Sequence, residues 1–157
     1  MTQLADKITE KIYLGQFDAH KDISFLKERN IGAILAVISD FYIEKKHEEN
    51  LIENLIDIKH IYVEDIEGFD IDSILNEAHR YIDKYVSNNI NILVCCRKGI
   101  SRSATVVLSY LMTRQNKTLA DAINHVRKKR SIINPNLGFM VSLTNLDEIL
   151  KDTREKN

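Results

Sequence analysis

Tryptophan is absent from this sequence of 157 residues, and the chain has only one proline, five glycines and two cysteines. Two cysteines cannot supply the disulfide framework of a small secreted domain, so we expect a reducing compartment: the cytoplasm, with the nucleus as an alternative. The few prolines and glycines leave no obvious flexible linker. The length suits one hydrophobic core, and we expect a single domain over residues 1–157 with its core at about 11–150.

Neither sign of charge dominates, because 22 Lys and Arg residues are balanced by 23 Asp and Glu residues. This balance argues against a protein that binds nucleic acid through a uniformly basic surface. The longest apolar runs, such as residues 31–38, are far shorter than the roughly 20 residues that cross a bilayer. The first residues show no secretory signal pattern. We therefore expect neither a nucleic acid nor a membrane as a partner.

Apolar periodicity predicts alternating strands and helices. Short runs rich in β-branched and aromatic residues predict strands over 11–15, 32–38, 58–64 and 90–95. Helical spacing predicts helices over 19–30, 71–86 and 103–115, with two more that begin after Thr118 and Asn136; residues 44–56 are ambiguous. This order predicts an α/β fold with a central, mostly parallel β-sheet flanked by helices.

Polar residues are expected to mark four helix ends. Asp70 is a candidate N-cap for the helix over 71–86, and the asparagines at 88–89 are a candidate stop. Thr118 with Asp121 resembles a capping box, and Asn136 is a candidate cap for the last helix.

The segment LVCCRKGISRS, residues 93–103, contains both cysteines and lies between a predicted strand and a predicted helix. Amide groups of such a loop and the positive end of the helix dipole create an anion site and favour the thiolate of Cys96. Gly99 lets the loop curl around a phosphate. Arg102 can hold two phosphate oxygens, and Ser103 can donate a hydrogen bond to the sulfur when it leaves.

The run C-R-K-G-I-S-R-S resembles the C-x5-R-[ST] motif of protein tyrosine phosphatases, and GISRSAT resembles their dual-specificity branch. The similarity extends to IYLG, YVED, SYLM and PNLGF and covers residues 11–146. It implies a protein-tyrosine-phosphatase-like fold and hydrolysis of phosphotyrosine, phosphoserine and phosphothreonine through a phosphocysteine. It also implies phosphorylated proteins as substrates and no metal or other cofactor.

The resemblance assigns roles to individual residues. Cys96 is the expected nucleophile, Arg102 binds the phosphate, and Ser103 assists the leaving sulfur. The expected substrate-binding loop contains Arg97, Lys98, Gly99, Ile100 and Ser101. Chemistry alone leaves the general acid open among Glu64, Asp65, Glu67, Asp70 and Asp72, and the resemblance selects Asp65. Asn136 is expected to support the loop rather than to touch substrate.

Two features admit alternative interpretations. Cys95 stands where the family usually has histidine; it either fills the end of a buried strand or forms a protective disulfide with an oxidised Cys96. The RKKR run at 127–130 is interpreted as a solvated helix end, with a basic rim that steers substrates as the alternative.

Three other functions are considered. The same loop chemistry would serve a phosphatase of phosphoinositides or of RNA 5′ ends. A phosphate-binding module without turnover is a second alternative, since Cys95 replaces the usual histidine. A thiol oxidoreductase is disfavoured, because two residues normally separate the resolving cysteine from the attacking cysteine.

Overall fold

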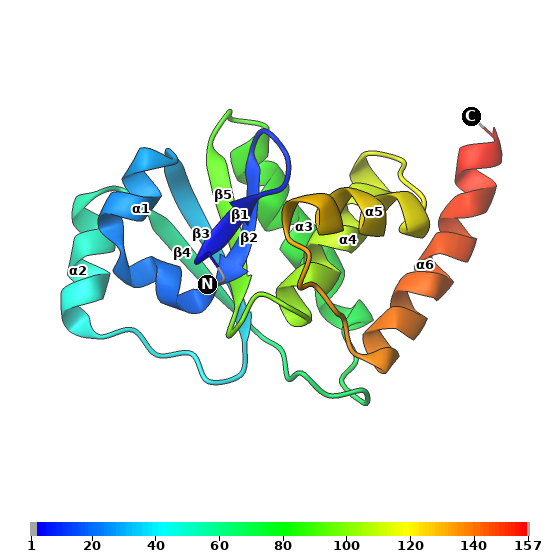
Figure 1. Cartoon of the computed structure of the whole chain (residues 1–157), viewed down its shortest axis with the longest axis horizontal. Coiled ribbons are helices and arrows are strands. Elements are labelled where there is room, and N and C mark those ends of the chain that lie inside the picture. Colours follow the sequence, from blue (N-terminus) through cyan, green and yellow to red (C-terminus); the bar gives the residue numbers. More distant parts are fainter. Residues whose placement is uncertain (1–2, 157) are drawn as a thin grey trace.

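The computed structural model describes residues 3–156. Its centre is a five-stranded sheet (Figure 1). In spatial order the strands are β1 (Ala5–Lys7), β2 (Ile12–Gln16), β5 (Asn91–Cys96), β3 (Ile31–Ile38) and β4 (Asp57–Tyr62). The last four pair in parallel, and β1 pairs antiparallel with β2. The prediction of an α/β fold with a mostly parallel sheet is confirmed.

The inner strands of the sheet are buried on both faces, as their uninterrupted apolar sequences predict. Every residue of β3 except Gly32 is buried, and so are five of the six residues of β5. Helices must therefore cover both faces of the sheet to exclude water from these strands.

Helices cover the two faces of the sheet (Figure 1). One side carries a 3-10 helix, η1 (Phe17–Lys21), with α1 (Ile23–Glu28) and α2 (Lys45–Glu53). On the other side α3 (Asp72–Val86) and α4 (Arg102–Arg114) contact the strands, while α5 (Leu119–Lys129) and α6 (Leu137–Lys156) pack against α4. Residues 102–112 of α4 are all buried, which confirms the prediction of a central helix.

The strand β1 was not predicted, because its three residues, Ala-Asp-Lys, show neither alternation nor β-branching. It forms by pairing with β2, where Ala5 lies opposite Gly15. A Cβ atom at Gly15 would lie 2.1 Å from the carbonyl oxygen of Leu4, so only glycine permits this approach. The long-range contact, rather than local propensity, creates the strand.

The expected helix over 19–30 is interrupted. The carboxylate of Asp22 accepts the amide of Phe25 at 3.0 Å and so caps α1, which separates this helix from η1. The ambiguous residues 44–56 contain α2.

The predicted cap at Asp70 is wrong. Helix α3 starts one residue later than that cap requires, and its N-cap is Ile71, whose backbone is already helical and whose side chain is fully buried. Asp70 contributes only its carbonyl oxygen, which accepts the Ser73 hydroxyl at 2.7 Å. Anchoring of Ile71 in the core places the carboxylate outside capping position.

The other predicted helix ends are confirmed. Thr118 Oγ1 accepts the Asp121 amide at 3.1 Å, and Asn136 Oδ1 accepts the Phe139 amide at 2.9 Å. Helix α3 ends at Val86, and Asn89 follows with a left-handed backbone (φ 64°).

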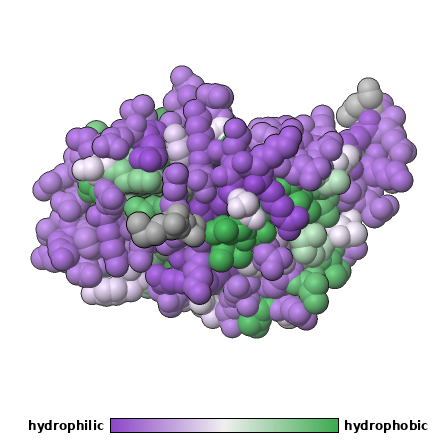
Figure 2. All heavy atoms as spheres, viewed as in Figure 1, coloured by the Kyte–Doolittle hydropathy of each residue, from purple (hydrophilic) through white to green (hydrophobic). Residues whose placement is uncertain are grey.

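The visible face of the molecule is mainly hydrophilic (Figure 2). Hydrophobic spheres gather at the lower right, over the start of α6, where Leu137 and Val141 are exposed. No helix within residues 3–156 is both long and apolar enough to span a bilayer.

Candidate active site

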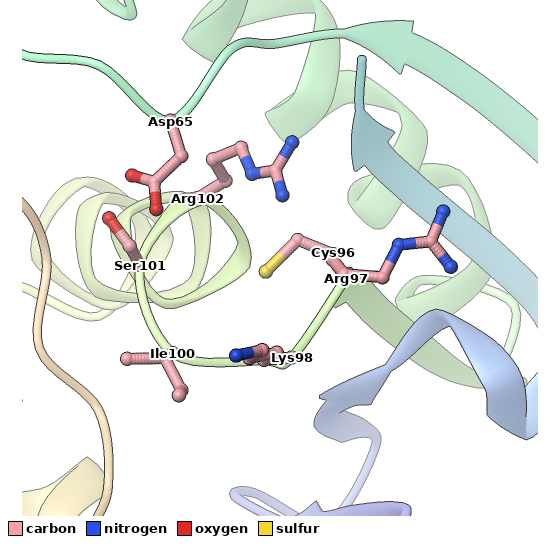
Figure 3. Close-up of a pocket in the computed structure, with 7 residues that line it drawn as sticks. All are labelled: Asp65, Cys96, Arg97, Lys98, Ile100, Ser101 and Arg102. Atoms are coloured by element: carbon pink, nitrogen blue, oxygen red, sulfur yellow. The ribbon is translucent and has the colours of Figure 1, made fainter. Parts of the chain in front are cut away.

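The loop after the central strand forms one wall of a pocket. Strand β5 ends at Cys96, α4 begins at Arg102, and residues 97–101 connect them. Open α/β sheets bind ligands at the carboxyl ends of their strands, where this loop lies. The pocket has a volume of about 250 Å³ and is lined by Asp65, Cys96, Arg97, Lys98, Ile100, Ser101 and Arg102 (Figure 3).

Gly99 is required at the turn of this loop for two reasons. Its φ of 68° is a conformation that side chains other than glycine rarely adopt. A Cβ atom at this position would also lie 2.6 Å from the carbonyl group of Gly15 in β2. The loop therefore curls tightly against the neighbouring strand.

The side chains of Cys96 and Ser103 are in contact beside the pocket. The sulfur of Cys96 lies 2.9 Å from the hydroxyl oxygen of Ser103, and both side chains are buried. Figure 3 shows the sulfur pointing into the space that the loop encloses. The structure thus brings together the two residues that the sequence placed seven positions apart.

The guanidinium of Arg102 is positioned to bind an anion. Its Nη1 donates to the carbonyl of Val63, the residue after β4, at 3.1 Å. Its Nε is buried and, within residues 3–156, has no hydrogen-bond acceptor. A buried donor without a partner is rare and favours an acceptor from outside the chain, such as a phosphate oxygen. Arg102 as a whole is only 9% exposed, and the bond to Val63 orients its guanidinium.

Asp65 faces the loop from the segment after β4, and Asn136 holds it there. The Asn136 amide group donates to Oδ1 of Asp65 at 3.0 Å, and the Asn136 backbone N–H donates to Oγ of Ser101 at 3.0 Å. One asparagine therefore connects the carboxylate to the loop between β5 and α4. Asn136 supports the loop, as predicted. None of the other four carboxylates of residues 64–72 lines the pocket.

The guanidinium of Arg97 points away from the sulfur of Cys96 (Figure 3). Its Nη2 atom binds Oδ2 of Asp40 at 2.8 Å, and Nη1 lies 3.9 Å from Oδ1 of Asp18. Carboxylates therefore offset the positive charge that Arg97 brings to the pocket edge, and Lys98 is the other cationic residue of the loop.

Cys95 is a buried residue of β5. Its side chain has no exposed surface, and burial raises the pKa of its thiol well above the ordinary value. Both cysteines are free, and successive side chains of a strand point to opposite faces. This geometry supports the interpretation of Cys95 as a residue that fills the strand end, and it opposes a disulfide with Cys96.

Sequence reasoning missed Arg130. The RKKR run was interpreted as solvated, and its first three residues are exposed, but Arg130 is only 2% exposed. Its Nε donates to the carbonyl of Gly99 at 2.9 Å. The continued helical spacing was the available signal, because Arg130 lies four residues after the buried Val126.

The described residues 3–156 contain no group of three or more His, Cys, Asp or Glu side chains that could hold a metal ion.

Comparison with known proteins identifies the family. The dual specificity phosphatase catalytic domain matches residues 12–149. Dual specificity protein phosphatase 1 of Arabidopsis thaliana is 32% identical over 144 residues, which cover 92% of this chain and 69% of that protein. Human dual specificity protein phosphatase 4 is 39% identical over 132 residues, which cover 84% of this chain but 32% of that protein.

A solved structure agrees on the fold. The crystal structure of human DUSP28 is 22% identical to this chain and superposes with a TM-score of 0.85 over 96% of this chain and 97% of that one. The family match includes β5, the loop and α4. The chain therefore belongs to the dual specificity phosphatases, the protein phosphatases of the protein tyrosine phosphatase superfamily that its sequence motif resembled.

Proposed function

We propose that this chain hydrolyses phosphotyrosine, phosphoserine and phosphothreonine in proteins through a phosphocysteine intermediate, with Cys96 as nucleophile. The observation that carries the proposal is the position of the Cys96 sulfur in a pocket that also contains the Arg102 guanidinium and the Asp65 carboxylate. A nucleophile, an anion-binding group and a proton donor around one phosphate-sized space are the parts that phosphoryl transfer to a thiolate needs.

In the first step the thiolate of Cys96 attacks phosphorus, an S–P bond forms and the bond to the substrate oxygen breaks. Asp65 donates its proton to that departing oxygen. Arg102 and the amides of the loop stabilise the negative charge on the three remaining phosphoryl oxygens.

In the second step a water oxygen attacks phosphorus and the S–P bond breaks. The Asp65 carboxylate, deprotonated in the first step, takes the proton of the water. The sulfur leaves as a thiolate and receives a hydrogen bond from Ser103. The products are inorganic phosphate and the original enzyme.

The remaining loop residues would bind the substrate in this scheme. Gly99, Ile100 and Ser101 contribute backbone amides, and Lys98 adds positive charge at the edge. Arg97 acts differently, because Asp40 and Asp18 bind its guanidinium on the side away from the Cys96 sulfur. Its contribution is a backbone amide and a fixed loop shape.

Protein substrates fit this pocket better than phosphoinositides or RNA 5′ ends. Both of those ligands bring several phosphates, which a basic rim would have to neutralise. Here Asp40 and Asp18 offset the positive charge of Arg97, which leaves Lys98 as the other cation of the loop. The alternative of a binding module without turnover is disfavoured by the general-acid candidate Asp65, which binding alone would not require.

The buried free thiols also favour a reducing compartment. We therefore propose a cytoplasmic protein, with the nucleus as an alternative. We further propose that residues 1–157 act as one catalytic domain with a core at about 11–150, which the family match over 12–149 supports.

Steady-state hydrolysis of an aryl phosphate, a phosphopeptide panel and soluble phosphoinositides tests the proposal. We expect turnover of the aryl phosphate and the phosphopeptides, and loss of all turnover in Cys96→Ser. Cys95→Ser is the matched control, because it changes the adjacent residue in the same way and should keep activity. A wild-type protein that leaves every phosphopeptide intact would refute the proposal, and faster hydrolysis of phosphoinositides would favour the alternative.

A further inference from the structure

Arg130 is the C-cap of α5 and points into the protein. Its side chain is 1% exposed, whereas the three basic residues before it are exposed. Burial of a cation is unfavourable unless its donors are satisfied. Two of its bonds go to consecutive loop carbonyls: Nε donates to Gly99 O at 2.9 Å, and Nη2 donates to Lys98 O at 3.0 Å.

These two bonds decide which way the loop amides point. The C=O and N–H groups of a trans peptide unit point in opposite directions, and the described residues contain no cis peptide. The carbonyl of Lys98 shares its peptide unit with the amide of Gly99, and the carbonyl of Gly99 shares its unit with the amide of Ile100. By drawing both carbonyls outward, Arg130 turns the amides of Gly99 and Ile100 away from itself, toward the opposite side of the loop.

The next peptide unit is held in the same way. The carbonyl of Ile100 accepts the backbone N–H of Asn134 at 2.7 Å, which orients the amide of Ser101. Three consecutive peptide units therefore have their carbonyls bound to the segment 130–134. Such a row of amides forms a concave anion site.

The opposite side of the Arg130 guanidinium is held by the N-terminal segment. Nη1 donates to Oδ2 of Asp6 in β1 at 2.9 Å and to the carbonyl of Gln3 at 3.2 Å. Asp6 is itself largely buried, with 21% of its side chain exposed. Both partners lie before the family match, which begins at residue 12.

We propose that Arg130 is a positioning residue for phosphate binding and that β1, through Asp6, holds Arg130 in the position that orients the loop. The inference rests on the proposed function, because it assumes that the loop binds the phosphate of the substrate. Arg130 has no direct contact with that phosphate; it acts by fixing the amides of Gly99 and Ile100.

Binding of tungstate, a phosphate-like dianion, tests this directly. We expect Arg130→Lys to weaken tungstate binding about tenfold or more, because one ammonium cannot hold two carbonyls in the geometry of the guanidinium fork. The kcat/KM for an aryl phosphate should fall by a similar factor. Shifts of the Gly99 and Ile100 amide resonances on tungstate addition should be reduced.

Arg154→Lys is the matched control. Arg154 also binds one carboxylate and two carbonyls, through Asp147 and Lys117, but away from the loop. We expect this variant to lower the melting temperature and to keep the tungstate Kd. Equal tungstate affinity in wild type and Arg130→Lys would overturn the proposal. So would an equal loss in both lysine variants, because general destabilisation would then explain it.

Asp6→Asn provides a second test. If Arg130→Lys does not fold, Asp6→Asn alone tests the proposal. It removes the carboxylate charge at the edge strand and should weaken tungstate binding threefold or more. An unchanged Kd in Asp6→Asn would refute the role of β1. Unchanged tungstate binding in these variants would refute only the role of Arg130 or of β1. If the proposed function itself were wrong, the wild-type protein would bind no tungstate.

Discussion

The sulfur of Cys96 and the hydroxyl oxygen of Ser103 are 2.9 Å apart, at the junction of β5 and α4. One residue ends the central strand and the other lies in the first turn of the buried helix. Because both elements are packed on all sides, this distance is set by the core and not by a mobile loop. In the proposed mechanism this hydroxyl donates to the sulfur when negative charge returns to it.

The Ser103→Ala variant should hydrolyse its phosphocysteine intermediate slowly. Loss of this hydrogen bond should lower kcat roughly 10- to 100-fold, because a hydrogen bond to a charged group contributes about 1.5–3 kcal/mol. Formation of the phosphoenzyme should be much less affected, so rapid mixing with an aryl phosphate should show a burst of phenol before the slow steady state. Ser109→Ala, a buried substitution in the same helix, should show no burst. Slow turnover of Ser103→Ala without a burst would contradict the assigned role.

The Asp65→Asn variant should discriminate between leaving groups. Loss of a general acid lowers the rate by about 10²–10⁴ when the departing oxygen needs a proton. We therefore expect a large fall in kcat/KM for phosphoserine peptides and a smaller fall for p-nitrophenyl phosphate, whose leaving group is a stable anion. Glu67→Gln, a nearby change outside the pocket, should leave both rates unchanged. An equal loss on both substrates would argue that Asp65 only shapes the pocket.

The two cysteines should differ in their reaction with iodoacetamide. Cys95 has no exposed surface, and burial raises the pKa of its thiol, so little thiolate forms near neutral pH. Cys96 lines the pocket. Mass spectrometry of the native protein should find a single carbamidomethyl group on Cys96, and tungstate should protect it. Modification of Cys95 at a comparable rate would mean that the end of β5 opens in solution.

His79 should make the protein less stable in mild acid. Burial lowers the pKa of His79 from 6.5 to about 4, with Arg114 as a smaller cause in the same direction and Asp83 opposing. Between these pH values the unfolded chain binds a proton that the folded chain excludes. The free energy of unfolding therefore falls as pH drops from about 6.5 to about 4, by roughly 3 kcal/mol in total.

Urea unfolding at pH 7.5 and pH 5 measures this effect. His79 Nε2 lies 2.8 Å from Oγ of Ser109, which donates its own proton to the carbonyl of Val106, so the histidine is the donor. His79→Gln keeps a donor without a titrating group and should lose part of the pH dependence. An unchanged pH dependence in His79→Gln would assign the acid sensitivity to other groups.

The sequence by itself determined the elements whose signals are local. Uninterrupted apolar runs predicted the inner strands, and helical spacing predicted α3 to α6. The spacing of Cys96, Gly99, Arg102 and Ser103 predicted a phosphate loop, because these residues are linked by a short turn whose shape depends on its own backbone. Thr118 and Asn136 cap helices that begin directly after them, so their roles also followed from neighbours in the chain.

Only the tertiary structure decided the contacts that hold this loop. Asn136 reaches Asp65 across 71 positions, and Arg130 reaches Gly99 across 31 positions and Asp6 across 124. A basic run at a helix end looks solvated when only its neighbours are known, and Asp70 looks like a cap until the burial of Ile71 is known. Such roles depend on which distant segments the strand order of the sheet brings together. The spacing of neighbouring residues does not encode that order.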